Sequence, residues 1–327
     1  MTSYKHISRR KFLRVLGIAG AGAALSGCSR SSLSVPNTTI STQTPPPAPT
    51  FQPPATSSGQ TYLAVAHGDD PAEITRRALE ALGGMQQFVK SGDIVILKPN
   101  ICTDYHTFEY AATTNPEVMA ELVRQCLGAG ARRVRVMDNP FGGIAERAYQ
   151  VSGIADAVTN AGGEMEILNS AKFVKTAIPE GRDIQEWWVY QDILDADVLI
   201  DVPIAKQHGS ARLTLGCKNL MGTIQKRELI HLNLHQRIAD LTSLLRPDLT
   251  IIDAYRILMD NGPTGGNLND VKLQKTIIAS ADIVTADSFA CTLFGLTAED
   301  VPYVSLAAEM GLGTKDLASI KIEEIIA

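Results

Sequence analysis

Short apolar runs alternate with longer amphipathic segments along most of the chain. The short runs are continuously apolar and stop at glycine, proline or polar residues, which is typical of strands buried on both faces of a sheet. The longer segments repeat apolar side chains every three or four residues, which is typical of helices with one face in a core. In the first half of the chain, this pattern predicts strands over residues 61–66, 93–97 and 132–137 and helices over residues 71–82 and 116–127.

The order strand, helix, strand, helix, strand predicts the fold class. Parallel strands joined by right-handed helical crossovers place helices on both sides of one sheet. We therefore expect an α/β fold with a doubly wound, mostly parallel sheet and helices on both faces. Farther along, the pattern predicts strands over residues 186–190, 196–204, 249–252 and 275–279 and helices over residues 233–245, 282–294 and 300–310. Trp187 and Trp188 are adjacent in the first of these strands, so their side chains should face opposite ways.

The first 28 residues have the pattern of an export signal. The twin arginine Arg9-Arg10 precedes an apolar run over residues 15–25, and the segment ends in a lipoprotein-type cleavage box at Cys28. The run is about half of the roughly 20 residues that a membrane-spanning helix needs. The pattern therefore predicts a signal peptide of the twin-arginine route with Cys28 as the lipidated residue. An uncleaved anchor is the alternative.

These features divide the chain into three predicted parts. Residues 1–28 are the twin-arginine lipoprotein signal, residues 29–60 are a disordered linker rich in Pro, Ser and Thr, and residues 61–327 are the α/β domain. We expect the twin-arginine translocase as the partner during export. The mature protein should be extracytoplasmic, in the periplasm or at the cell surface, and held on a membrane by its lipid without spanning it.

The charge balance disfavours nucleic acid as a partner. The formal net charge of the whole chain is −5. The signal has no acidic residue and five cationic ones, which are Lys5, Arg9, Arg10, Lys11 and Arg14. Without the signal, the chain has 25 Lys and Arg against 35 Asp and Glu, a net charge of about −10. A strongly acidic domain is repelled by a phosphate backbone.

The cysteines of the domain are not spaced as metal ligands usually are. The domain has four of them, and no two form a C-x-x-C pair: Cys102, Cys126, Cys217 and Cys291. The chain therefore carries no iron–sulfur cluster motif and no zinc ribbon. Twin-arginine export carries folded proteins, so we expect these thiols to fold reduced in the cytoplasm and to lie free in the core.

Unusual polar residues follow several of the predicted strands. In open α/β sheets, ligands bind beyond the carboxyl ends of the strands. The residues in these positions are Lys98 and Asn100, Asp138 and Asn139, Lys206 and His208, and Asp253. Their repeated occurrence at strand ends predicts a ligand site at this edge.

The residues after the strand 196–204 predict an anion site. Lys206 is followed by Lys218 and Asn219, and Lys98 ends an earlier strand. Ammonium and amide groups bind carboxylates or phosphates through charge-assisted hydrogen bonds. Nearby glycines, Gly216 and Gly222, would permit close approach of the backbone. A solvated loop with scattered charges is the alternative.

His208 is the candidate acid/base residue, because the ordinary pKa of histidine lies nearest neutrality. Two other histidines, His231 and His235, are four residues apart and would lie on one side of a helix. With His208 or an aspartate, that pair could hold a divalent metal, although the H-E-x-x-H pattern is not present. The alternative is that both are ordinary polar positions.

The segment 259–267 is dense in turn residues, including Gly262 and Gly266. We weigh two interpretations, a hairpin-like turn and a glycine-rich lid or backbone cradle over a ligand. Asp282 and Asp287, which follow this segment, are two further candidates. Asp282 should cap the helix that follows it, whereas Asp287 lies inside that helix, where a pocket-facing role would explain it.

Together these motifs resemble the domain of unknown function family 362 (DUF362). The resemblance rests on ILKPN at 96–100, TNP at 114–116, AKQH at 205–208, KNLMG at 218–222, Asp253, Gly262-Pro263 with Gly266, and Asp282 with Asp287. It implies an α/β fold, and some relatives look fused to a ferredoxin-like module that this chain lacks. Gln207 and Asp260-Asn261 depart from the family pattern. The resemblance implies no particular activity.

Our leading hypothesis is an exported enzyme that acts on an anionic small molecule, with a divalent metal as one candidate cofactor. Its ligand-binding residues would be Lys98, Asn100, Lys206, Lys218, Asn219, Asp253, Gly262 and Gly266. The alternative is a lipid-anchored protein that binds a solute or metal complex without chemistry. A scaffold whose motif residues only cap helices and strands is a third interpretation.

Overall fold

The computed structural model describes residues 62–327, so the predicted signal and the whole predicted linker lie outside the described residues. A sheet of ten strands runs through the domain in the order β12-β1-β11-β10-β7-β2-β3-β4, and β8 and β9 branch from β10. Its strands are β1 Leu63–His67, β2 Ile94–Pro99, β3 Arg133–Asp138, β4 Glu164–Ile167, β7 Val198–Val202, β8 Ile204–His208, β9 Arg212–Thr214, β10 Leu249–Leu258, β11 Val271–Ser280 and β12 Ile322–Ile326.

The sheet is mostly parallel, which confirms the predicted fold class. Strands β4, β3, β2, β7 and β10 pair in parallel, as do β10 with β8 and β1 with β12. The antiparallel pairs are β1 with β11, β10 with β11, and β8 with β9. The first three strands and the helices between them follow the predicted βαβαβ order.

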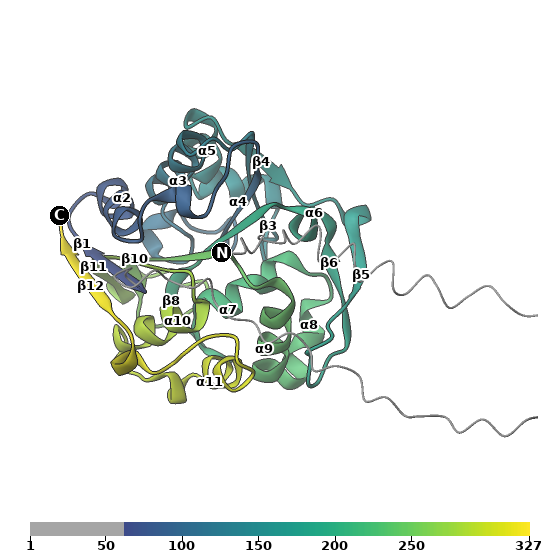
Figure 1. Ribbon diagram of the computed structural model, residues 1–327. Coiled ribbons are helices and arrows are strands. Elements are labelled where there is room, and N and C mark those ends of the chain that lie inside the picture. The colour runs from purple at the N-terminus through teal and green to yellow at the C-terminus, as the bar shows by residue number, and fades with distance from the viewer. Residues whose placement is uncertain (1–61) are drawn as a thin grey trace, which may run out of the picture.

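Helices cover both faces of the sheet (Figure 1). One layer contains α2 Pro71–Ala81, α3 Pro116–Gly128, α4 Ala145–Val151 and α5 Ile154–Asn160. The other contains α6 Gln191–Asp195, α7 Gly216–Asn219, α8 Arg227–Ile230, α9 Leu234–Leu245, α10 Ile283–Thr292 and α11 Pro302–Glu309. Adjacent strand residues pack into different layers, as with Val95 and Ile96 of β2, because side chains alternate along a strand. This explains why the strands are continuously apolar.

A separate two-stranded antiparallel sheet contains β5 Phe173–Ala177 and β6 Glu186–Tyr190. Its two tryptophans differ in burial as expected, although their rings also meet edge-on with centroids 6.4 Å apart. Trp187 is buried, whereas the Trp188 ring is partly exposed at the edge and lies 3.6 Å from the Lys226 ammonium. The cation stacks on the negative face of the indole.

The predicted strand over residues 196–204 is two strands in the structure. Pro203 separates β7 from β8, because proline has no N–H to donate to the ladder. The strands predicted over 249–252 and 275–279 are both longer, since β10 and β11 continue as a hairpin around the segment 259–267. Within residues 62–327, no helix is long and apolar enough to cross a membrane.

Candidate functional site

Four of the predicted ligand-binding residues meet at the carboxyl edge of β2, β7 and β8. The Lys98 ammonium donates to Asn219 Oδ1 at 2.8 Å, and the Asn100 amide donates to the same oxygen at 2.9 Å. Asn100 Oδ1 accepts from the Lys206 ammonium at 3.0 Å. We call Lys98, Asn100, Lys206 and Asn219 the lysine–asparagine network. Three of these, Lys98, Asn100 and Lys206, are among the polar residues expected at strand ends, and Asn219 of α7 joins them.

The charges inside this network are already partnered. Lys98 is 1% exposed, and it donates to Pro99 O at 2.7 Å and forms an ion pair with Asp138 at 2.9 Å in addition to its bond with Asn219. Lys206 donates to Ala112 O at 2.6 Å, and its burial lowers its pKa. The structure therefore gives Lys98 a structural role rather than the predicted role of an anion clamp.

Asp201 completes the floor of the network. One carboxylate oxygen accepts from the Asn219 amide at 2.8 Å, while the other is buried without a hydrogen-bond partner within the described part of the chain. Burial raises the pKa of Asp201 well above its usual range, although the nearby Lys98 opposes that shift. Burial and the nearby carboxylates of Asp287 and Asp138 thus disfavour the charged form of Asp201, whereas Lys98 and Asn219 favour it.

Gly222 allows the backbone to close over the ion pair. A Cβ atom there would lie 1.9 Å from Asp138 Oδ1 and 2.7 Å from the Lys98 ammonium nitrogen. The Gly222 carbonyl also accepts from Asn139 N at 3.1 Å. The predicted close backbone approach is present, and it seals the network rather than exposing it.

Asp287 positions the short helix α7, which carries Lys218 and Asn219. Its two carboxylate oxygens accept from Gly216 N at 2.7 Å and Cys217 N at 2.9 Å. Full burial raises its pKa to about 7. Binding the first amides of α7 explains an aspartate in the middle of α10, so the structure replaces the predicted pocket-facing role. Asp282 caps α10 as predicted, through Thr285 N at 2.9 Å.

Lys218 differs from the other lysines of the site. It has no hydrogen bond or ion pair among the residues from 62 onward, and its side chain is partly exposed. Burial lowers its pKa to about 7, and the cations Lys206, Arg227 and Lys98 add to that shift while Cys102 opposes it. Its ammonium thus feels the positive charge of these three cations and has no counterion in the described part of the chain. An anion bound here would supply a counterion and reduce the repulsion from the neighbouring cations.

His208 is 8% exposed, and its electrostatics differ from the prediction. Burial, followed by the charges of Lys218 and Lys206, lowers its pKa to about 3. Nδ1 accepts from Ser210 N at 3.1 Å and Ala211 N at 3.2 Å, so the proton of the neutral ring lies on Nε2. The prediction that His208 is the acid/base residue rests on an ordinary pKa near neutrality, and the buried ring does not have one. Lys218 titrates in that range instead.

Asp253 does not join the network. Its carboxylate accepts from Asn115 N at 2.7 Å and Tyr255 N at 3.0 Å, and burial raises its pKa to about 6. Asn115 is the N-cap of α3. Asp253 therefore ties β10 to the beginning of α3, and the structure supports this structural role rather than ligand binding.

The segment 259–267 forms the turn between β10 and β11 and also reaches the site. Gly262 N donates to Gln207 Oε1 at 2.7 Å, and a Cβ at Gly262 would lie 1.8 Å from Gln207 O. Pro263 O accepts from Cys102 Sγ at 3.4 Å. Gly266 has a φ of +125°, which favours glycine, and lies against the His106 ring. The hairpin interpretation is confirmed, and this hairpin packs over Gln207 and Cys102.

The expected helical pair of histidines is not formed. His231 lies in a 3-10 turn, η6 His231–Asn233, and its Nδ1 lies 3.1 Å from Arg227 O. His235 lies in α9, where its ring stacks on Tyr303. No group of three or more His, Cys, Asp or Glu side chains in residues 62–327 is arranged to hold a metal ion. The structure therefore gives no support to the predicted metal ligation by His231 and His235.

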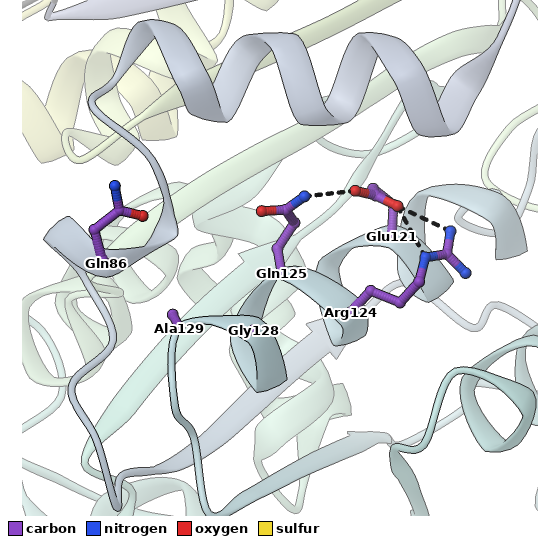
Figure 2. A pocket seen from close by; sticks show the side chains of 6 residues that line it. All are labelled: Gln86, Glu121, Arg124, Gln125, Gly128 and Ala129. Atoms are coloured by element: carbon purple, nitrogen blue, oxygen red, sulfur yellow. Dashed lines mark hydrogen bonds and ion pairs between the residues drawn. The ribbon is translucent and has the colours of Figure 1, made fainter.

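The four cysteines of the domain are free and buried, as predicted. A surface hollow of about 600 Å³ lies elsewhere, between the second half of α3 and the 3-10 turn η2 Met85–Gln87 (Figure 2). Its main charged residue, Glu121, is already bonded to Arg124 and Gln125. None of the predicted site residues lines this hollow.

The order of these motifs on this fold agrees with a family model described as "Domain of unknown function (DUF362)", which matches residues 95–292. The chain belongs to the DUF362 family. It is 27% identical over 252 residues to a thylakoid-associated protein of Synechocystis sp., covering 72% of this chain and 74% of that protein. The segment that the family model matches, residues 95–292, includes the whole lysine–asparagine network and Lys218.

Among solved structures, this DUF362 chain is similar to the lactate racemase apoprotein from Thermoanaerobacterium thermosaccharolyticum. The TM-score is 0.43 and the sequence identity is 13%. The similarity covers 74% of this chain and 58% of that protein, so the chain spans less than two thirds of its length.

Replacing Gly222 with alanine should disrupt the network. The added methyl group would collide with Asp138 and Lys98, and overpacking of this kind costs about 1–3 kcal/mol. We expect Gly222→Ala to lower the urea midpoint, measured by circular dichroism. Gly209→Ala is the matched control, because a Cβ at that position would have no neighbouring atom within 4 Å. Equal midpoints for the two variants would contradict the proposed packing.

Proposed function

We propose that this DUF362 protein is an enzyme that binds an anionic small molecule at Lys218 and transfers a proton to or from it. The observation that carries the proposal is the Lys218 ammonium, which has no hydrogen bond or ion pair within the described domain and lies among Lys206, Arg227 and Lys98. Unpartnered charge of one sign at the ligand-binding edge of an α/β sheet favours a ligand of the opposite sign.

The proposed chemistry follows from the protonation states. A pKa of about 7 leaves Lys218 partly protonated at neutral pH, which suits a group that both accepts and donates a proton. The neutral His208 ring keeps its proton on Nε2 and would serve as a hydrogen-bond donor. Arg227 donates to Asn139 O at 2.6 Å and Pro140 O at 2.9 Å, so it holds the adjacent loop and adds fixed positive charge.

Binding without chemistry is the second candidate function. It is favoured by the saturation of Lys98 and Asn219, which leaves few polar groups of the network free to act on a substrate. In that case Lys218 would capture an anionic solute, and no turnover would accompany binding. Both functions require an anion at Lys218, so the same binding experiment tests their common basis.

Sulfate binding should depend on the protonation of Lys218. Sulfate keeps a constant charge near neutrality, so its affinity should fall as the pH rises above about 7, approaching tenfold per pH unit as the ammonium is lost. Calorimetry on the full-length chain with Arg9→Lys, Arg10→Lys and Cys28→Ser, which we call the export-blocked chain, would measure this.

Two substitutions in the export-blocked chain separate charge from shape. Lys218→Met should weaken sulfate binding about 10–100-fold, whereas Lys218→Arg should keep binding and remove its pH dependence between pH 7 and 9. Lys175→Met is the control, because Lys175 is paired with Glu186 on the two-stranded sheet. Unchanged sulfate affinity in Lys218→Met would exclude this anion site.

We further propose that the protein is exported and lipid-anchored through Cys28. The twin arginine and cleavage box support this, and the thylakoid-associated relative is consistent with a place at a membrane. The anionic ligand, the membrane and the twin-arginine translocase are the proposed partners, and nucleic acid is not.

Lipid attachment has a direct test in cells fed an alkyne-labelled palmitate. The native chain should incorporate the label, and Cys28→Ser should not, because a serine cannot form the thioether. Cys102→Ser is the control, since Cys102 is buried in the folded domain. Equal labelling of Cys28→Ser and the native chain would contradict anchoring at Cys28.

A further inference from the structure

Exposed apolar side chains gather on the loops beside the candidate site. Of the nine large apolar side chains that are exposed in residues 62–327, five lie on the loop 139–144 and on two segments that are hydrogen-bonded to it. We call these five the apolar rim: Tyr105, Phe141, Ile144, Leu229 and Leu232, which are 57%, 60%, 60%, 39% and 75% exposed. Exposed apolar residues that cluster on one face mark a binding surface more often than scattered ones do.

Hydrogen bonds join the three segments of the rim. Phe141 N donates to Cys102 O at 2.8 Å, and Ile144 N donates to Asp104 Oδ2 at 3.1 Å. Asp104 is 6% exposed, and a Cβ at Gly143 would lie 2.0 Å from its Oδ1. The buried carboxylate thus holds the loop of Phe141 and Ile144 firmly, with its apolar side chains outward.

The rim adjoins the anion site through two shared residues. Cys102, whose carbonyl holds Phe141, is also close enough to Lys218 to influence it electrostatically. Arg227 also acts electrostatically on Lys218, in the direction opposite to Cys102. It belongs to the helix that carries Leu229 and donates to the carbonyls of the loop before Phe141. The segments that carry the apolar side chains therefore adjoin residues that act on the Lys218 ammonium.

We infer that the ligand of this site is an amphiphilic anion, with its acidic headgroup at Lys218 and an alkyl portion along the apolar rim. This inference rests on the proposed function and specifies its substrate class. Such a headgroup could come from a soluble amphiphile or from an anionic lipid in a bilayer. The shared chemistry is a negative charge attached to a hydrocarbon chain.

Alkyl sulfates test the inference in the export-blocked chain. Hexyl sulfate has four more methylene groups than ethyl sulfate, and each methylene that is buried strengthens binding about fourfold. We expect hexyl sulfate to bind at least about tenfold more tightly than ethyl sulfate. The double variant Phe141→Ser, Ile144→Ser should remove most of that gain and leave the affinity for inorganic sulfate unchanged.

The matched control is Ile326→Ser, because Ile326 is 83% exposed on β12 and outside the rim. Equal affinities for hexyl and ethyl sulfate, with sulfate binding that still needs Lys218, would overturn the amphiphile and leave the proposed anion site intact. Absence of binding by all three anions would overturn both.

Vesicle flotation distinguishes the two sources of the headgroup. Binding to phosphatidylglycerol vesicles but not to phosphatidylcholine vesicles, lost in Lys218→Met and in the double rim variant, would support a bilayer lipid. Binding of hexyl sulfate without vesicle binding would support a soluble amphiphile. Vesicle binding that both variants retain would contradict a role for this surface.

Discussion

The buried ion pair between Lys98 and Asp138 is the contact on which the candidate site depends. Lys98 is the penultimate residue of β2 and Asp138 is the last residue of β3, so their pairing at 2.9 Å fixes the carboxyl edges of two neighbouring strands. Asp138 also accepts from Ile101 N at 2.6 Å, and Gly222 closes over both groups. A buried pair is tolerated only when its remaining donors and acceptors are satisfied, and here the backbone and Asn219 satisfy them.

Residues whose hydrogen bonds are satisfied within the fold support the site, whereas a residue without such partners is available to a ligand. Lys98, Lys206 and Asn219 form their hydrogen bonds within the fold, and Asp287 holds the helix that presents Lys218. Lys218 lies near these groups, feels the like charges of Lys206, Arg227 and Lys98, and is paired with no carboxylate of residues 62–327. The same burial that makes Lys98 structural therefore gives Lys218 an altered pKa, which is typical of functional groups.

The sequence was sufficient to predict the sheet, its helical layers and the gathering of Lys98, Asn100, Lys206 and Asn219, because strand periodicity and strand-end position follow from local pattern. It could not predict which lysine is free, since Lys98 and Lys218 look alike until their neighbours are placed. His208 shows the same limit, because its pKa is set by its burial and by the charges of Lys218 and Lys206 in the folded protein. The prediction that His231 and His235 lie on one side of a single helix is wrong because the chain forms a 3-10 turn before α9.

The most direct test of this account is the titration of Lys218 itself. Carbon-13 at the lysine Cε position reports the protonation of each ammonium by NMR, and Lys218→Arg would identify the Lys218 signal in the export-blocked chain. We expect a midpoint at about pH 7 that rises when sulfate is added. A midpoint near the ordinary lysine value of roughly 10.4, unaffected by sulfate, would contradict it.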